Sequence, residues 1–193
     1  MNPLSPDFYL REDALEISQD LLGKVLMTNI NGIITGGIIT ETEAYMGPED
    51  RASHAYGGRR TKRNEMMYHQ GGIAYVYLIY GIHAMFNVVT NSSEIPHAIL
   101  IRAIKPLYGI EHMLKRRGKN EITPSLAGGP GTLAQALGIH TMHNGLTLKG
   151  PHIWLEDQDI EVDKRKIIKG PRVGIDYAGE HALLPWRFCM GKS

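Results

Sequence analysis

The chain has 193 residues with a formal net charge of +1 at pH 7, and its composition, 42% hydrophobic and 21% charged, is that of a globular protein able to bury a substantial core. No apolar run is long enough to span a bilayer, and the single cysteine, Cys189, excludes an internal disulfide and a cysteine metal cluster. Because residues 1–10 also lack the basic start and apolar centre of a signal peptide, we expect a cytoplasmic protein with no membrane partner and a single domain over residues 1–193.

The first predicted elements are a short helix and a β-hairpin. Residues 13–22 begin with an aspartate that can cap a helix, and Gly23 can supply the left-handed residue that ends it. Residues 24–30 and 33–45 have the composition of strands. Asn31-Gly32 between them tolerates the positive φ angles of a tight turn, so we expect the two strands to pair.

A long polar connection and an aromatic segment follow. Residues 46–72 contain several glycine pairs, and a connection of this length is often functional. Residues 73–90 are rich in aromatic and β-branched side chains and are interrupted at Tyr80-Gly81, which predicts two strands that meet in a turn there. An apolar strand over 98–104 and a helix over 106–117, begun by a proline, are expected next.

The last third predicts one more helix and several short strands. A glycine-rich stretch at 128–132 leads into a helix that ends near residue 138, and this stretch is either an anion-binding helix start or a tight turn. Strands are predicted at 152–156, 172–176 and 185–190. Together the elements indicate a single α+β domain in which peripheral helices cover a mostly antiparallel sheet.

Three chemically active side chains alternate along the second predicted strand. Glu41, Glu43 and Tyr45 share one face if the segment is extended, because strand side chains alternate between faces. The two carboxylates are either a coupled pair, in which proximity raises one pKa, or exposed strand residues. A carboxylate beside a flat ring suits a site that stacks a planar group and performs acid or base chemistry on it.

The alternation of side chains along a strand also separates the tyrosines of the aromatic segment into two groups. Tyr75 and Tyr77 share one face, whereas Tyr80 has the opposite parity and lies at the turn. Tyr77 either packs within the sheet or lines a pocket with Tyr45 and His54. Tyr80, beside a glycine at an exposed tip, has fewer packing partners and could act as a wedge between stacked bases.

Most of the cationic residues lie in three stretches, each of which is either a solvated face or part of a phosphate-binding surface. The three stretches are Arg59, Arg60, Lys62 and Arg63; Lys115, Arg116, Arg117 and Lys119; and Lys164, Arg165, Lys166, Lys169 and Arg172. If they converge in space, they favour a nucleic-acid partner.

Three motifs occur in a specific order and spacing: Glu41 to Asp50, His54 to Asn64, and Tyr75 to Gly81. Shorter matches follow at Asn87, Ile101 to Ala103, Gly129-Pro130, Gln135 to Leu137 and Arg172 to Gly174. In this combination the chain resembles the alkyladenine (3-methyladenine) DNA glycosylase family over most of its length. The resemblance implies a curved, barrel-like sheet with a protruding β-hairpin.

The same resemblance implies a function in base-excision repair. Members of the family flip alkylated or deaminated purines out of double-stranded DNA and hydrolyse the N-glycosidic bond with water, leaving an abasic site. Alkylation of a ring nitrogen makes the base cationic, which improves it as a leaving group and favours a tyrosine face through cation–π attraction. We expect a monofunctional, monomeric enzyme that needs no cofactor or metal ion and associates with DNA in the cytoplasm.

The resemblance also assigns roles to single positions of this sequence. Glu43 matches the general base that deprotonates the attacking water, while Arg102 and the main-chain carbonyl of Val173 match groups that place this water. Glu41 matches no residue with an assigned role.

Further matches concern DNA and base binding. Tyr45, His54 and Tyr77 match the walls that hold the flipped base, and Asn87 matches a residue that disfavours the exocyclic amine of guanine. Tyr80 matches the residue that fills the gap left in the base stack. We expect contacts to the DNA backbone from Arg59, Arg60, Thr61, Lys62 and Arg63.

Two departures from the family pattern leave questions open. Thr132 stands where many relatives carry a lysine, which removes one expected phosphate contact, and His69 to Gly72 replaces a proline-containing segment.

Three other functions compete with the glycosylase interpretation. A metal hydrolase is disfavoured because no His-Glu-x-x-His motif occurs, whereas a non-catalytic nucleic-acid-binding protein and a glycosylase with an amine nucleophile are left to experiment.

Overall fold

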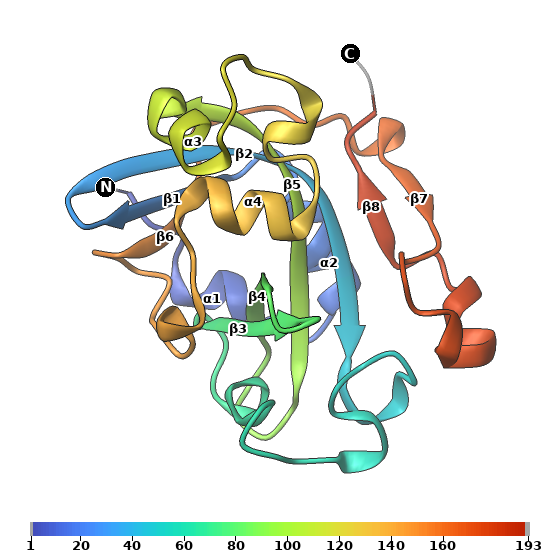
Figure 1. Ribbon diagram of the computed structural model, residues 1–193. Coiled ribbons are helices and arrows are strands. Elements are labelled where there is room, and N and C mark those ends of the chain that lie inside the picture. Colours follow the sequence, from blue (N-terminus) through green and yellow to red (C-terminus); the bar gives the residue numbers. More distant parts are fainter. Residues whose placement is uncertain (1, 192–193) are drawn as a thin grey trace.

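An antiparallel sheet that curves into a half-barrel forms the centre of the computed structural model, which describes residues 2–191 (Figure 1). Within these residues the sheet has 8 strands, and its main path runs β3-β4-β5-β2-β1-β6, with β8 paired to β2 and β7 to β8. The strands are β1 (Val25–Ile30), β2 (Ile33–Met46), β3 (Ala74–Ile79), β4 (His83–Thr90), β5 (His97–Tyr108), β6 (Ile153–Glu156), β7 (Ile168–Gly170) and β8 (Arg187–Cys189). The predicted α+β class with a mostly antiparallel sheet is confirmed.

Short helices lie around the sheet, as predicted. In Figure 1, α4 crosses in front of the sheet while α1 and α2 lie behind it, and α4 packs against β4 and β5. The α-helices are α1 (Pro6–Tyr9), α2 (Ala14–Asp20), α3 (Ile110–Arg117) and α4 (Pro130–Leu137). The 3₁₀ helices are η1 (Gly47–Glu49), η2 (Tyr56–Gly58), η3 (Glu65–Tyr68), η4 (Pro124–Leu126), η5 (Thr141–His143), η6 (Lys164–Lys166) and η7 (Asp176–Leu183).

Local sequence signals explain where the first elements begin and turn. The Asp13 carboxylate accepts hydrogen bonds from the amides of Leu15 (2.8 Å) and Glu16 (3.1 Å), so two amides that lack partners within α2 are satisfied. Asn31 and Gly32 have φ angles of 56° and 78°, which lets β1 and β2 meet in a tight turn. Both predictions are confirmed.

The aromatic hairpin is also confirmed. Strands β3 and β4 pair in register from Ala74 opposite Val88 to Ile79 opposite His83, and Tyr80 lies in the turn between them. The turn requires positive φ at Tyr80 (52°), an uncommon conformation for a bulky residue. The hairpin therefore presents a tyrosine at its tip.

The helix predicted over 106–117 is shorter than expected, because Pro106 belongs to β5. Pro106 pairs with Gly37 at a point where the register between β2 and β5 shifts. A proline, which has no amide hydrogen, is tolerated in a sheet at such a bulge. Gly109, with φ of 63°, then turns the chain into α3.

The strand predicted over 172–176 is wrong, and β7 was not predicted. Residues 172–176 make no ladder with another strand, and the amide of Val173 donates instead to the side chain of Glu43. Alternation of apolar residues alone could not reveal that the partner of this backbone group is a carboxylate. The prediction at 185–190 is confirmed in part by β8.

The two faces of β2 serve different purposes. Thr42 points toward α2, where its hydroxyl donates to the carbonyl of Ser18 (2.8 Å) and accepts from the Ser18 hydroxyl (3.0 Å). Glu41, Glu43 and Tyr45 occupy the other face, as their alternation predicts.

The core joins apolar residues of the helices and the sheet, among them Ile17, Leu21, Phe86, Ile99, Ile101, Leu133 and Leu137. None of the helices within residues 2–191 combines the length and apolar character needed to cross a membrane.

The cap of α2 gives a first testable expectation. Asp13→Ala removes two hydrogen bonds to free amides and should lower the free energy of unfolding by about 1 kcal/mol. Ser5→Ala is the matched control, because Ser5 is the N-cap residue of α1 but its side chain makes no capping hydrogen bond. Urea denaturation followed by circular dichroism measures both changes, and equal stability of the two variants would contradict this role of Asp13.

Candidate active site

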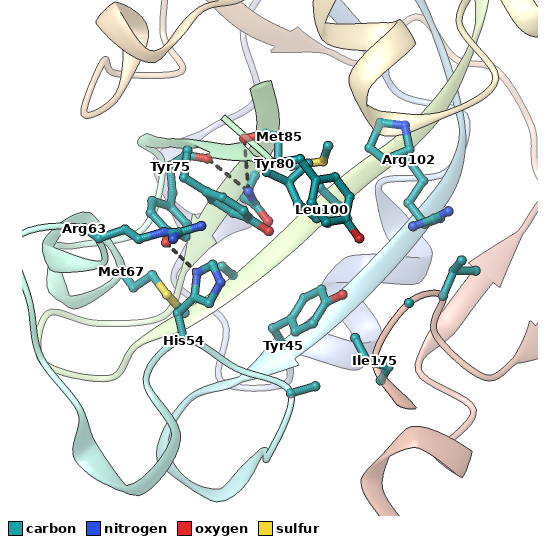
Figure 2. A pocket seen from close by; sticks show the side chains of 18 of the residues that line it. Tyr45, His54, Arg63, Met67, Tyr75, Tyr80, Met85, Leu100, Arg102 and Ile175 are labelled. Carbon is teal, nitrogen blue, oxygen red and sulfur yellow. Dashed lines mark hydrogen bonds between the residues drawn. The ribbon is translucent and has the colours of Figure 1, made fainter. Parts of the chain in front are cut away.

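A cavity of about 460 Å³ lies on the face of β2 that carries Tyr45. Its walls come from β2, from the β3–β4 hairpin, from β5, from the long loop after β2 and from residues 173–177. Figure 2 shows Tyr45, His54 and Tyr75 around this cavity, with Arg102 at one side. Segments far apart in the sequence therefore build one aromatic pocket, of a size that suits a small organic ligand.

Glu43 lies directly behind the wall of this cavity and has no solvent exposure. Its Oε1 accepts a hydrogen bond from the amide of Val173 (2.8 Å) and lies 3.3 Å from Nη1 of Arg102. Its Oε2 accepts a hydrogen bond from the Tyr45 hydroxyl (2.9 Å). The three residues that contact the carboxylate all line the cavity.

Burial controls the acidity of Glu43. Desolvation raises the pKa of the carboxyl group above its ordinary value, and the Arg102 guanidinium, the Val173 amide and the Tyr45 hydroxyl oppose this rise. A carboxylate with a raised pKa binds a proton more readily than one in water, so Glu43 can accept a proton from a neighbouring group.

Glu41 and Glu43 share Arg102, which confirms that the two carboxylates lie on one face of β2. Nε of Arg102 donates to Oε1 of Glu41 (2.9 Å), and the same oxygen lies 3.3 Å from Nη1 of Arg187 on β8. Glu41 is thus held between two arginines and fixes one side of the Arg102 guanidinium. The negative charge of Glu41 also adds a small rise to the pKa of Glu43.

An aromatic cluster forms the opposite wall. The ring of His54 packs edge-on against Tyr77 at 4.6 Å between centroids, and Tyr75 lies 5.2 Å from Tyr77. Tyr75 was predicted only to share a face with Tyr77, yet its hydroxyl also forms a 2.7 Å hydrogen bond with Nδ1 of His54 (Figure 2). Burial, with help from Arg63 and Arg59, lowers the pKa of His54 to about 4, so this ring is neutral at pH 7.

Asn87 and Tyr80 line the same cavity from the hairpin. The Asn87 amide nitrogen donates to the carbonyls of Tyr75 (3.1 Å) and Met85 (3.4 Å), which fixes the orientation of this buried side chain. Tyr80 is 87% exposed at the hairpin tip, and its neighbour Ile82 is 72% exposed. Two large apolar side chains exposed together at a tip are available for contact with a partner.

The residues predicted to contact a DNA backbone differ in their exposure and in their ion pairs within the protein. Arg60 forms ion pairs with Glu65 (2.7 Å) and Glu94 (2.6 Å) and lies 4.5 Å above the ring of Tyr68. Arg59 and Lys62 are exposed. Within the first basic stretch, Arg59 and Lys62 are therefore more available than Arg60 for contact with an external phosphate.

The other members of this group contact the site more closely. Arg63 lies 5.2 Å above the ring of Tyr77 and donates to the carbonyl of Leu78 (3.0 Å). The amide and hydroxyl of Thr61 both donate to the Asn64 side chain (2.7 and 2.9 Å). Arg59, Thr61 and Arg63 also line a second cavity of about 290 Å³ next to His54.

Lys164, Arg165, Lys166 and Lys169 of the third basic stretch are exposed, as expected for a solvated face, and Arg172 is the exception. Arg172 is buried, Lys164 pairs with Asp20 on α2 (2.6 Å), and Arg165 pairs with Asp163 (3.0 Å). The partner of Arg165 is two residues away, whereas the partner of Lys164 is remote in sequence and could not be inferred from the charge cluster.

The Thr132 side chain bonds back to the glycine-rich stretch before α4. The Thr132 hydroxyl accepts a hydrogen bond from the amide of Gly129 (3.0 Å) and donates to the carbonyl of the same residue (2.8 Å). The side chain at the position of the family's lysine is thus used to start the helix. Within residues 2–191, no group of three or more His, Cys, Asp or Glu side chains is arranged to hold a metal ion.

Comparison with known proteins shows the family of this chain. A family model described as methylpurine-DNA glycosylase (MPG) matches residues 7–193. A protein of Chlamydia felis named "Putative 3-methyladenine DNA glycosylase" is 48% identical over 188 residues, covering 97% of this chain and 95% of the relative. A Bacillus cytotoxicus protein of the same name is 44% identical over 191 residues, covering 95% and 93%. The chain belongs to the methylpurine-DNA glycosylase family.

Proposed function

We propose that this DNA glycosylase removes alkylated or deaminated purines from double-stranded DNA with a water molecule activated by Glu43. The observation that carries the proposal is the burial of Glu43 directly behind an aromatic cavity, with Tyr45, Arg102 and Val173 in contact with both. A damaged base weakens its own stacking and pairing, so it can enter this cavity at a lower energetic cost than a normal base.

The pocket is suited to planar, electron-poor bases. Tyr45, Tyr77 and His54 offer ring faces and edges on two sides of the cavity, and a neutral His54 adds no positive charge that would repel a cationic purine. A ring-alkylated base is attracted to tyrosine faces by cation–π interaction. Asn87, held by two main-chain carbonyls, forms a rigid polar wall that can discriminate among exocyclic groups.

The chemical step follows from the position of Glu43. A water molecule gives its proton to the Glu43 carboxylate as its oxygen attacks C1′, the bond from C1′ to the purine nitrogen breaks, and the bonding electrons leave with the base. Arg102 and the carbonyl of Val173 hold the water, and the Arg102 cation stabilises the ionised form of Glu43 before the reaction. The residues that line the cavity in the described part of the chain include no lysine, which supports water rather than an amine as nucleophile.

Glu43→Gln tests the general base. The amide cannot accept the proton, so the single-turnover rate of base release should fall by about 100-fold or more, whereas binding to a duplex containing ethenoadenine should persist. Gel electrophoresis after alkali treatment measures release, and fluorescence anisotropy measures binding. Release at the rate of the unmodified enzyme would refute the role of Glu43, and borohydride trapping of a covalent complex would exclude water as nucleophile.

The raised pKa of Glu43 gives an expected pH dependence. Only the ionised carboxylate can accept a proton, so the rate should rise with pH through the pKa of Glu43, at a midpoint above the ordinary value of 4.5. A duplex containing 7-methylguanine is the substrate of choice for this measurement, because its base is already cationic and needs no acid to leave. A single-turnover rate that stays constant from pH 7 down to pH 4.5 would contradict this expectation.

Tyr80→Ala tests the wedge at the hairpin tip. Removing the exposed ring should weaken extrusion of the damaged base while the chemical site keeps its structure, because Tyr80 has few contacts in the protein. A fluorescent base placed beside the lesion measures extrusion in a stopped-flow experiment. Tyr108→Ala is the control, since Tyr108 is also partly exposed but lies at the far end of β5, away from the cavity. Equal extrusion by both variants would remove the proposed role of Tyr80.

A further inference from the structure

Arg172 and Asp50 form a buried ion pair beside the candidate active site. Both side chains are 0% exposed, and the pair is bidentate, with Nη1 of Arg172 2.5 Å from Oδ2 of Asp50 and Nη2 2.8 Å from Oδ1. Two parallel charge-assisted hydrogen bonds fix the plane of the guanidinium as well as its position. Neither residue lines the cavity, so direct contact with a bound base does not explain the pair.

The guanidinium of Arg172 is tied to the strand that carries Glu43. Nη1 donates to the carbonyl of Ala44 (2.8 Å), the residue between Glu43 and Tyr45. Because Val173 follows Arg172 in the chain, this contact holds the Val173 amide against β2, where the amide donates to Oε1 of Glu43 (2.8 Å).

The same guanidinium also supports the ring of Tyr45. Its central carbon lies 4.7 Å from the centroid of the Tyr45 ring and 4.9 Å from the centroid of the Trp186 ring. Arg172 therefore fills the space between two aromatic side chains and limits movement of Tyr45. The hydroxyl of that ring donates to Oε2 of Glu43 (2.9 Å).

One buried cation thus holds both uncharged hydrogen-bond donors of the carboxylate. We propose that Arg172 and Asp50 are positioning residues for base release, which keep the Val173 amide and the Tyr45 hydroxyl on the carboxylate of Glu43. The inference rests on the proposed function, because it concerns the geometry of the general base. It assigns a role to Asp50 and to an arginine whose sequence context predicts a surface cation.

A purely structural role is the competing explanation. Asp50 also accepts hydrogen bonds from the amides of Met46 (3.3 Å) and Ala52 (3.0 Å), so it anchors the start of the long loop after β2. Buried ion pairs seldom add net stability over well-packed apolar residues, however, although removal of one partner is strongly destabilising. The two roles differ in one observable, because only the positioning role changes the acidity of Glu43.

Other charged and titratable groups also act on Glu43 and stay in place when Arg172 is changed. They are Glu41 on β2, Tyr77 on β3, Arg102 on β5, and Arg187 and Cys189 on β8, whereas Tyr45 on β2 is one of the two donors that Arg172 holds. Burial already raises the pKa of Glu43, and the two donors held by Arg172 oppose that rise. If the donors move away, the carboxylate loses stabilisation and its pKa rises further.

Arg172→Lys tests the proposal, because lysine keeps the charge but cannot make the bidentate pair and reach Ala44 in one plane. The single-turnover rate on a 7-methylguanine duplex is plotted against pH, and its acid limb is the range in which the rate rises with pH. In the variant this limb should move to higher pH by about one unit, which corresponds to an approximately tenfold lower rate at a given pH on the limb. The rate should recover at high pH. Arg165→Lys is the matched control, because Arg165 forms an exposed pair with Asp163 and should leave the profile unchanged.

The outcomes separate this proposal from the proposed function. If Glu43→Gln releases the base normally, the proposed function fails. If Glu43→Gln is inactive but folded Arg172→Lys has the acid limb of the unmodified enzyme, only the positioning role is overturned. Asp50→Asn, which keeps the side-chain shape and weakens the pair, provides a second measurement and should shift the limb in the same direction. Loss of the fold in both variants, seen by circular dichroism, would show a structural requirement and would also overturn the proposal.

Discussion

Burial of the Glu43 carboxylate is the constraint on which the site depends. A charge removed from water is costly unless hydrogen bonds and an opposite charge replace the lost solvation. Arg102, the Val173 amide and the Tyr45 hydroxyl supply this replacement from three different parts of the chain. The balance leaves a carboxyl group with a raised pKa, so its carboxylate is a stronger base than a carboxylate in water.

The sheet makes this arrangement possible because alternate side chains separate two environments. Thr42 joins β2 to α2 on one face, while Glu41, Glu43 and Tyr45 meet β5 and the aromatic hairpin on the other. The rigid strands fix the Glu43 carboxylate and much of the pocket wall, whereas loops contribute His54 and Val173. Such a division suits the proposed function, in which the carboxylate is held firmly while the pocket admits a base extruded from DNA.

Features set by local geometry could be predicted from the sequence, and features set by distant partners could not. Asn31-Gly32 determines its turn through tolerated φ angles, and the spacing of Glu41, Glu43 and Tyr45 determines their common face. Pro106 was misassigned because its place at a bulge depends on pairing with β2. Arg172 was grouped with surface cations because its partner, Asp50, is remote in sequence. The resemblance to a known family singled out Glu43 as a candidate, but its hydrogen bonds with the Val173 amide and the Tyr45 hydroxyl emerge only in three dimensions.

The most direct test of this account compares the titration of Glu43 with the pH dependence of catalysis. Nuclear magnetic resonance of glutamate labelled with ¹³C at its carboxyl group, assigned by the signal missing in Glu43→Gln, gives the pKa of Glu43 in the free enzyme. The acid limb of kcat/KM for a 7-methylguanine duplex reports the essential base of the same free enzyme. We expect both midpoints to coincide at a value above 4.5. A Glu43 signal that titrates at its ordinary value, or at a pH different from the acid limb, would contradict the assignment of Glu43 as the buried base.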